Sequence, residues 1–138
     1  MLPKPTKIVT TTLSREFYYG PVSAFIADLN AKGERASWQS LCLTAMQQFM
    51  AINERTNGEV AKQFSAEELE PFGMSEWRNP RKGRDPRATT QTTRVPSDVF
   101  QDLWKFGKWS MKDGTPWTLQ HLSTAAVVWY LREHGVKV

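Results

Sequence analysis

The stretch of sequence that decides the fold is TTQTTRVP, at residues 89–96. β-Branched and polar residues follow one another along it, a composition that favours a β-strand. Its proline would end the strand and preset the backbone of a following helix. A similar threonine-rich run, KIVTTTL, lies at residues 7–13. The sequence therefore predicts two short strands, each followed by a helix.

A second pattern also occurs twice, in the segments that follow these strands. SWQSL at residues 37–41 corresponds to TLQHL at residues 118–122, and each is followed at the same spacing by an alanine and an aromatic residue. A pattern repeated at one fixed spacing indicates two copies of one unit. Because Ser37 and Thr118 are favoured N-cap residues, each pattern marks the start of a second helix. The predicted unit is strand, helix, helix.

Chain length limits how these two copies can fold. Each copy is too short to bury a large core alone, so we expect residues 1–138 to form a single compact domain in which the copies pack together. The first unit would span 6–57 and the second 88–135. The linker between them, 58–87, is expected to hold one short helix capped by Ser65, then a basic loop rich in proline.

Apolar residues at helical spacing place the remaining helices and the core. A first helix is expected to begin at Gly20-Pro21 and to end near Gly33. Another should begin near Ser97 and carry Trp104 on its apolar face. The expected core includes Phe25, Leu41, Phe49, Leu103, Leu122 and Trp129, and two further tryptophans, Trp77 and Trp117, are expected to pack over loops.

Composition argues against several classes of protein. The single cysteine, Cys42, excludes a disulfide within the chain, and two histidines supply too few ligands for a zinc site. No phosphate-binding glycine motif or paired serine and histidine stands out, so we predict no enzyme, no metal and no cofactor. No apolar run is long enough to span a bilayer, which favours a cytoplasmic, soluble protein. A net charge of +4 weakly favours a polyanionic partner.

The second unit resembles the ribbon-helix-helix superfamily of DNA-binding proteins. The resemblance rests on Thr90-x-Thr92-x-Arg94-Val95-Pro96, then a helix, a glycine turn and the helix that begins near Thr118. It implies a mainly α fold with a short two-stranded antiparallel β-ribbon that enters the major groove of double-stranded DNA. Two copies in one chain imply a tandem ribbon-helix-helix that forms an intramolecular pseudo-dimer. Pairing between two chains on adjacent half-sites is the alternative.

The resemblance also assigns base contacts in the second strand. By family position, Thr90, Thr92 and Arg94 would face the bases. A guanidinium can pair bidentately with guanine, which makes Arg94 the best single candidate for specificity.

Base contacts in the first strand depend on its register. If Leu13 corresponds to Val95, then Ile8, Thr10 and Thr12 point outward, and Thr10 and Thr12 are candidate base contacts. A register offset by one residue would instead expose Lys7 and Thr11. Because Thr12 replaces an arginine here, we expect the second strand to carry more of the specificity.

Phosphate contacts would come from helix N-termini and from cations. The family holds a phosphate at the N-terminus of its second helix, through free amides and the helix dipole, and Ser37 and Thr118 are the matching positions. His121 would be an exposed polar residue near the same end. Expected cationic contacts are Lys7, Arg78, Arg81, Lys82, Arg84 and Arg87. The basic loop would equally serve as a solubilising linker.

Three functional hypotheses follow. The first is a sequence-specific transcriptional regulator of a plasmid or other mobile element. The second is a relaxosome accessory protein that binds a transfer origin, as conjugation regulators related to this superfamily do. The third is a protein-interaction module, such as an antitoxin-like or phage inhibitor protein. Duplex binding that weakens steeply with salt separates the first two from the third.

Overall fold

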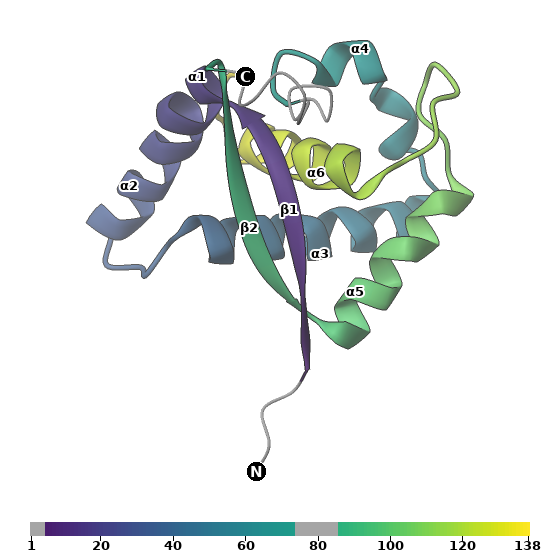
Figure 1. Ribbon diagram of the computed structural model, residues 1–138, viewed down its shortest axis with the longest axis horizontal. Helices are drawn as coiled ribbons and strands as arrows, with labels where there is room; N and C mark the ends of the chain where they lie inside the picture. The colour runs from purple at the N-terminus through teal and green to yellow at the C-terminus, as the bar shows by residue number, and fades with distance from the viewer. Residues whose placement is uncertain (1–4, 74–85) are drawn as a thin grey trace.

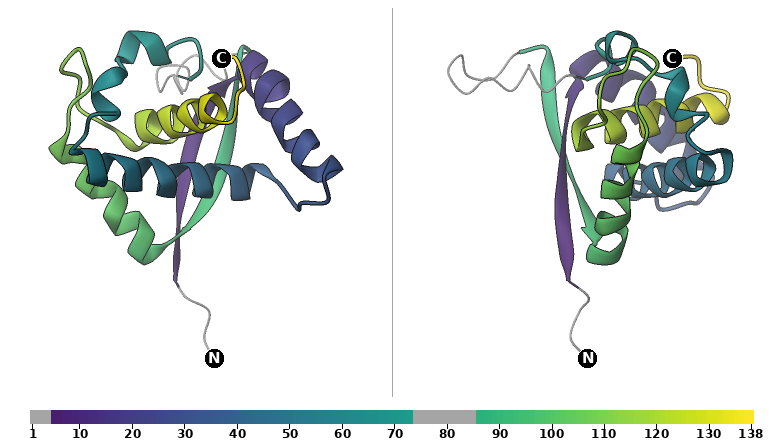
Figure 2. Two further views of the ribbon diagram at one scale, coloured as in Figure 1. Left: turned by 180° about the vertical axis from the view of Figure 1, so that it is seen from behind. Right: turned by 90° about the vertical axis from the view of Figure 1, so that its right-hand side faces the viewer.

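Two antiparallel strands form an outer layer of the molecule, and the helices among the described residues cover one face of it (Figures 1 and 2). The structure is a computed structural model that describes residues 5–73 and 86–138. Strand β1 (Thr6–Ser14) pairs with β2 (Ala88–Pro96) along its whole length within this one chain. The expected mainly α fold with a short antiparallel ribbon is confirmed.

The first helical segment begins earlier than the sequence suggested. Helix α1 (Arg15–Phe17) starts directly after β1, and it runs through a π-helical turn (Tyr18–Val22) into α2 (Ser23–Ala31). The expected start at Gly20-Pro21 is therefore wrong. The wider π turn accommodates Pro21, which has no N–H to donate. The Ser23 hydroxyl donates to the Tyr18 carbonyl at 2.7 Å, which gives that carbonyl a further partner.

Helices α3 (Trp38–Thr56) and α6 (Leu119–Glu133) pass behind the ribbon in Figure 1 and pack on each other. Both predicted caps are confirmed: the Ser37 hydroxyl accepts from the Ser40 amide, and the Thr118 hydroxyl accepts from the His121 amide. Helix α3 ends at Thr56, and its C-cap Asn57 is left-handed, with a φ of 53°, so the helix closes where the first unit was expected to end. The repeated pattern thus marks the two central helices.

Shorter elements surround this pair. The linker contains a 3₁₀ turn (Ala61–Gln63) and α4 (Ala66–Leu69), which Ser65 caps as predicted. Helix α5 (Ser97–Trp104) follows β2 without a break, and a 3₁₀ turn (Lys105–Lys108) continues it. Most of the expected basic loop, together with Trp77, lies outside the described residues.

One hydrophobic core draws on both repeats. Of the expected core residues, Leu41, Phe49, Leu103 and Leu122 are buried, whereas Phe25 and Trp129 are only partly buried. Trp117 packs against the core and not over a loop, with its ring centroid 5.0 Å from that of Phe106 and 6.0 Å from that of Phe49.

Trp104 departs from the sequence-based expectation, because it is 61% exposed. Leu103 and Phe106, on either side of it in the chain, occupy the core positions. Trp104 is the last residue of α5, and its ring makes an edge contact with Phe100 at 5.9 Å. It is therefore not part of the buried face of its helix.

Candidate nucleic-acid interface

The two faces of the ribbon differ in what covers them. Val9, Leu13 and Val95 face the helices and are buried, and Thr11 is buried with its hydroxyl donating to Ser123 at 2.8 Å. Ile8, at the alternate parity, is 60% exposed. Since strand side chains alternate between faces, this pattern settles the register of β1. The offset that would expose Thr11 is wrong, although Lys7 is exposed near the strand's start.

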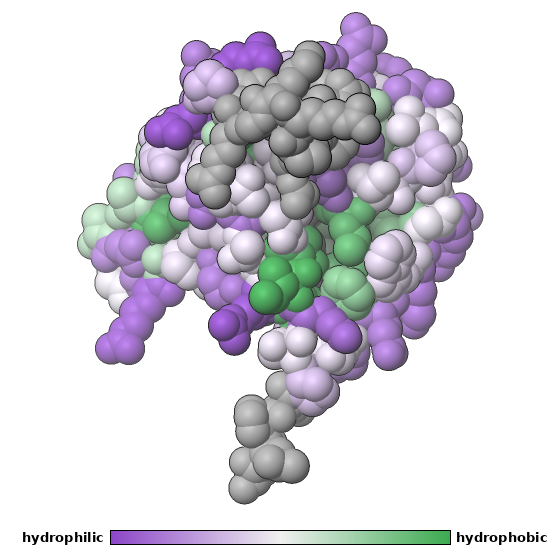
Figure 3. All heavy atoms as spheres, viewed as in Figure 1, coloured by the Kyte–Doolittle hydropathy of each residue, from purple (hydrophilic) through white to green (hydrophobic). Residues whose placement is uncertain are grey.

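The outer face of the ribbon, defined by the alternate residues Ile8, Thr10, Thr12, Thr90, Thr92 and Arg94, collects most of the predicted base contacts. Thr90, Thr92 and Arg94 are exposed, and Thr10 is partly exposed. Thr10 lies opposite Thr92 at the centre of the ladder, and Ile8 lies opposite Arg94. Seen from this side, the coloured surface is largely polar, with apolar patches near its centre and at its left edge (Figure 3). These side chains from distant parts of the sequence therefore share one surface.

Thr12 is the exception on the outer face, and its predicted base contact is contradicted. It is 0% exposed, although its parity matches that of Ile8 and Thr10. The linker lies against this end of β1, because the Ser14 amide donates to the Phe72 carbonyl at 2.7 Å. A side chain at Gly73 would collide with the Thr12 carbonyl oxygen. Thr12 therefore cannot reach a base in this fold.

Two glutamines hold the outer edges of the ribbon. The Gln39 side chain donates to the Arg94 carbonyl and accepts from the Arg94 amide, both at 2.7 Å. The Gln120 side chain makes the same pair of bonds to the backbone of Thr12, at 2.7 and 2.8 Å. Each central helix is thus fixed to the strand of the other repeat. Sequence reasoning missed this role, although both glutamines belong to the repeated pattern.

Corresponding contacts recur beneath the ribbon. Thr11 bonds to Ser123, and the corresponding Thr93 lies beside Cys42. Burial raises the pKa of the Cys42 thiol to about 12, and the nearby Thr93 side chain acts in the opposite direction. The Cys42 thiol is therefore protonated at neutral pH, as a buried apolar group would be.

The ends of the strands correspond in the same way. The Arg15 amide donates to the Arg87 carbonyl at 2.8 Å, and the Ser97 amide donates to the Pro5 carbonyl at 3.1 Å. Arg15 and Ser97 are the first residues of the helices that follow β1 and β2. Each strand therefore passes into its helix beside the start of the other strand.

The N-termini of α3 and α6 lie beside the ribbon. Gln39 and Gln120, which bond to the strands, are the second residues of these helices. The caps Ser37 and Thr118 are both exposed. In the part of the chain that the structure describes, the amides of the first two residues of each helix have no acceptor. Such amides, together with the helix dipole, favour an anion at each position.

The charged side chains within the two strands are all positive. Neither strand contains an acidic residue, whereas Lys7 lies in β1 and Arg94 in β2. Arg87, exposed, comes immediately before β2. The other predicted phosphate contacts, Arg78, Arg81, Lys82 and Arg84, lie outside the described residues.

His121 contributes no positive charge to this surface at neutral pH. Its Nδ1 atom lies 3.2 Å from the Thr118 hydroxyl. Burial lowers the pKa of His121, and the Asp113 carboxylate acts in the opposite direction. The side chain is partly buried, not exposed as expected. Any anion at the α6 N-terminus would therefore contact amides and a hydroxyl.

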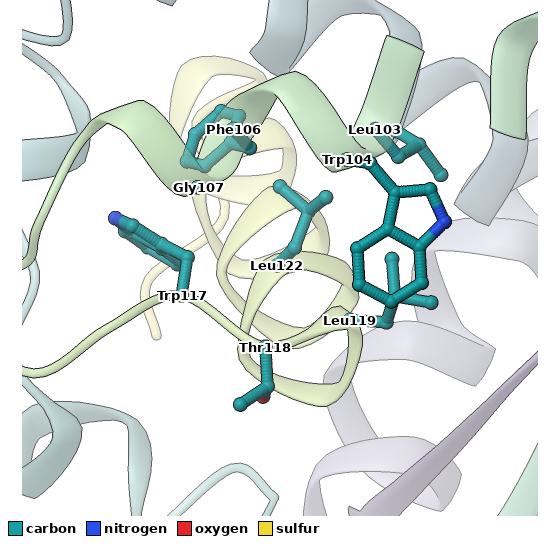
Figure 4. Close-up of a pocket in the computed structure, with 8 residues that line it drawn as sticks. All are labelled: Leu103, Trp104, Phe106, Gly107, Trp117, Thr118, Leu119 and Leu122. Atoms are coloured by element: carbon teal, nitrogen blue, oxygen red, sulfur yellow. The ribbon is translucent and has the colours of Figure 1, made fainter. Parts of the chain in front are cut away.

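Two hollows among the described residues are weak alternatives as a functional site. A small cavity of about 30 Å³ lies between α5 and the start of α6, where Trp104 and Trp117 flank Leu122 (Figure 4). That volume suits a water molecule and not a substrate. An open groove of about 520 Å³ separates α3 from α5. Its charged side chains pair with one another, Lys108 with Glu54 at 3.1 Å and Lys105 with Asp102 at 2.9 Å.

Comparison of the chain with protein-family models, with curated proteins and with solved structures found no match. Within residues 5–73 and 86–138, no helix has both the length and the apolar character needed to cross a membrane. Assignment of a function therefore depends on the geometry of this chain alone.

Proposed function

We propose that this protein is a sequence-specific double-stranded DNA-binding protein whose ribbon enters the major groove. The observation that carries the proposal is the outer face of the ribbon, which none of the described helices covers. It presents Thr90, Thr92 and Arg94 from β2 and Thr10 from β1. The major groove, about 12 Å wide, admits a two-stranded β-ribbon. Guanidinium and hydroxyl groups at alternate positions are suited to the donors and acceptors of base edges there.

Backbone support makes Arg94 the strongest base contact in this proposal. Both backbone groups of Arg94 are bonded to Gln39, so the strand is held in place at this residue. A fixed backbone reduces the entropy lost when the side chain orders on a base. We therefore assign Arg94 a bidentate contact with the O6 and N7 atoms of a guanine.

Phosphates on either side of the groove would be held by the two helix N-termini. Ser37 and Thr118 cap the starts of α3 and α6. Two residues further along each helix, Gln39 bonds to β2 and Gln120 bonds to β1. Lys7 and Arg87 add positive charge near the two ends of the ribbon. Phosphate contacts position a protein on the duplex, and base contacts supply the specificity. Contacts from Arg78, Arg81, Lys82 and Arg84 stay a prediction from the sequence.

A tandem ribbon-helix-helix arrangement is part of the proposal. Thr10 pairs with Thr92, its own counterpart in the second repeat, as expected at the centre of a two-fold ladder. The glutamine bonds on either side also correspond, Gln39 with Arg94 and Gln120 with Thr12. These equivalences support an intramolecular pseudo-dimer.

The biological setting we propose is the cytoplasmic regulation of a plasmid or other mobile element. Transcriptional control at a promoter and accessory binding at a transfer origin would use the same surface. Mapping the bound site separates them, because a promoter supports the first role and an origin the second.

Selection from a random duplex pool, followed by titration at several salt concentrations, tests DNA binding directly. We expect one enriched sequence and an affinity that falls steeply as salt rises, because phosphate contacts release counterions. Arg94→Ala should weaken binding to the enriched duplex by about 1–3 kcal/mol more than binding to random duplex, whereas Lys7→Ala should weaken binding to both alike. No duplex binding at low salt would exclude the proposal. A loss from Arg94→Ala that is equal on the enriched and random duplexes, as for Lys7→Ala, would exclude base contact by Arg94.

A protein-interaction module is the second candidate, favoured by two exposed aromatic side chains. Trp104 is 61% exposed and Tyr19 is 58% exposed. Large aromatic residues are enriched where proteins bind one another. Trp104→Ala would impair this function and leave duplex binding unchanged. If the chain binds no duplex at low salt, this candidate replaces the first.

A further inference from the structure

Ile8 is a large apolar side chain on a surface that is otherwise polar. It is 60% exposed at the outer face of the ribbon, directly opposite Arg94. The Arg94 amide and carbonyl are bonded to Gln39, so they point away from β1. Ile8 and Arg94 are therefore a non-hydrogen-bonded pair, in which the two Cα atoms lie only about 4.5 Å apart. The two side chains leave the ribbon next to each other.

The other end of the ribbon is built differently. The position that corresponds to Arg94 is Thr12, which is buried beside the linker. The position that corresponds to Ile8 is Thr90, a short polar residue. One end of the outer face thus presents a guanidinium and a branched alkyl group, and the other presents a single threonine.

We propose that Ile8 and Arg94 act together on two neighbouring base pairs, Ile8 against the methyl group of a thymine and Arg94 on the adjacent guanine. The inference rests on the proposed function and makes the target asymmetric, with the stronger sequence requirement in the half of the site that faces this pair. Thr12 contributes no base contact, so the two halves of the target need not be related by symmetry.

The dimensions of duplex DNA fit this assignment. Stacked base pairs are about 3.4 Å apart, so side chains from one cross-strand pair reach neighbouring base pairs. Thymine is the base that carries a methyl group in the major groove, and apolar side chains contact it there. A contact with the thymine methyl removes apolar surface of Ile8 from water and so stabilises the complex, whereas an Ile8 that stays in water adds nothing to the affinity.

Base analogues that remove one group at a time test the assignment on the full chain. The duplex enriched from a random pool is remade with each thymine replaced singly by deoxyuridine, which lacks the methyl group. A second series replaces each guanine by 7-deazaguanine, which lacks the N7 acceptor. Affinities of the unmodified protein, Ile8→Ala, Arg94→Ala and Thr90→Ala are then measured by fluorescence anisotropy. Ile8 is exposed, so Ile8→Ala is expected to fold normally.

We expect one deoxyuridine position to weaken binding about three- to fivefold, the effect of losing one buried methyl group. Ile8→Ala should abolish that sensitivity, and Thr90→Ala, the matched control, should keep it. At one guanine, the 7-deaza replacement should weaken binding by the unmodified protein and leave the affinity of Arg94→Ala unchanged. That guanine should neighbour the methyl-sensitive thymine.

Three results would overturn the inference. They are methyl sensitivity of equal size in both halves of the site, methyl sensitivity that persists in Ile8→Ala, and enrichment of a duplex in which no thymine methyl matters. In each of these the proposed function stands, because the protein still selects a duplex. Failure to bind any duplex would instead end both.

Discussion

Replacing Gln120 by methionine tests how the buried edge of the ribbon is held. Gln120 is buried and satisfies both the amide and the carbonyl of Thr12, which is itself buried. Methionine has a similar shape and cannot make these bonds, so both backbone groups would be left without partners. Each buried unsatisfied group costs about 1–3 kcal/mol, which gives a loss of about 2–6 kcal/mol in the free energy of unfolding.

Gln39→Met is the matched control, because Gln39 makes the same two bonds to Arg94 at an exposed edge. Water can replace the glutamine there, so we expect a loss of only about 1 kcal/mol. Urea unfolding followed by circular dichroism gives both values, and the melting temperatures should fall by about 3–5 °C per kcal/mol. Equal losses from the two variants, or a larger loss from Gln39→Met, would refute the reasoning that burial decides the cost.

Two further expectations concern the interior. Because the pKa of Cys42 rises from an ordinary 9.0 to about 12, the unfolded chain loses the thiol proton first as pH increases. The contribution of the buried, protonated Cys42 thiol to the free energy of unfolding should be complete below pH 9. Above pH 9 it should fall by about 1.4 kcal/mol per pH unit, up to about pH 12. Cys42→Ala should lack this component in urea titrations, and parallel slopes for the two proteins would contradict it. Gly73→Ala should cost about 1–3 kcal/mol, since its Cβ would overlap the Thr12 carbonyl. Gly107→Ala, with nothing within 4 Å of its Cβ, is the control, and similar losses from both would show that the linker packs loosely.

Local chemistry made several parts of the fold predictable. Ser37, Ser65 and Thr118 cap helices where the sequence placed them, because a side-chain oxygen beside free amides acts within a few residues. The sequence placed Val95 on the inward face of the second strand, where it is buried, but left two registers open for the first strand, and the burial of Leu13 decides between them.

Contacts between distant segments could not be predicted from the sequence. Thr12 has the composition and spacing of an exposed strand residue, and only the position of Gly73 in space reveals that it is covered. Pro21 suggested a helix start, but it lies within a π turn inside a longer helical segment. The sequence showed that a glutamine recurs in both repeats. It did not show that these glutamines bond to Arg94 and Thr12, because those contacts depend on how the two repeats pack.

Strand pairing within one chain has a consequence for how the protein folds. Residues of β1 emerge from the ribosome long before those of β2, so the N-terminal half cannot complete its ribbon during its own synthesis. Pairing must also close a long loop, which slows folding relative to a protein built from local contacts. In return, the folding rate should not depend on protein concentration, because no encounter between two chains is needed. Such a protein could reach its folded state even at a few copies per cell.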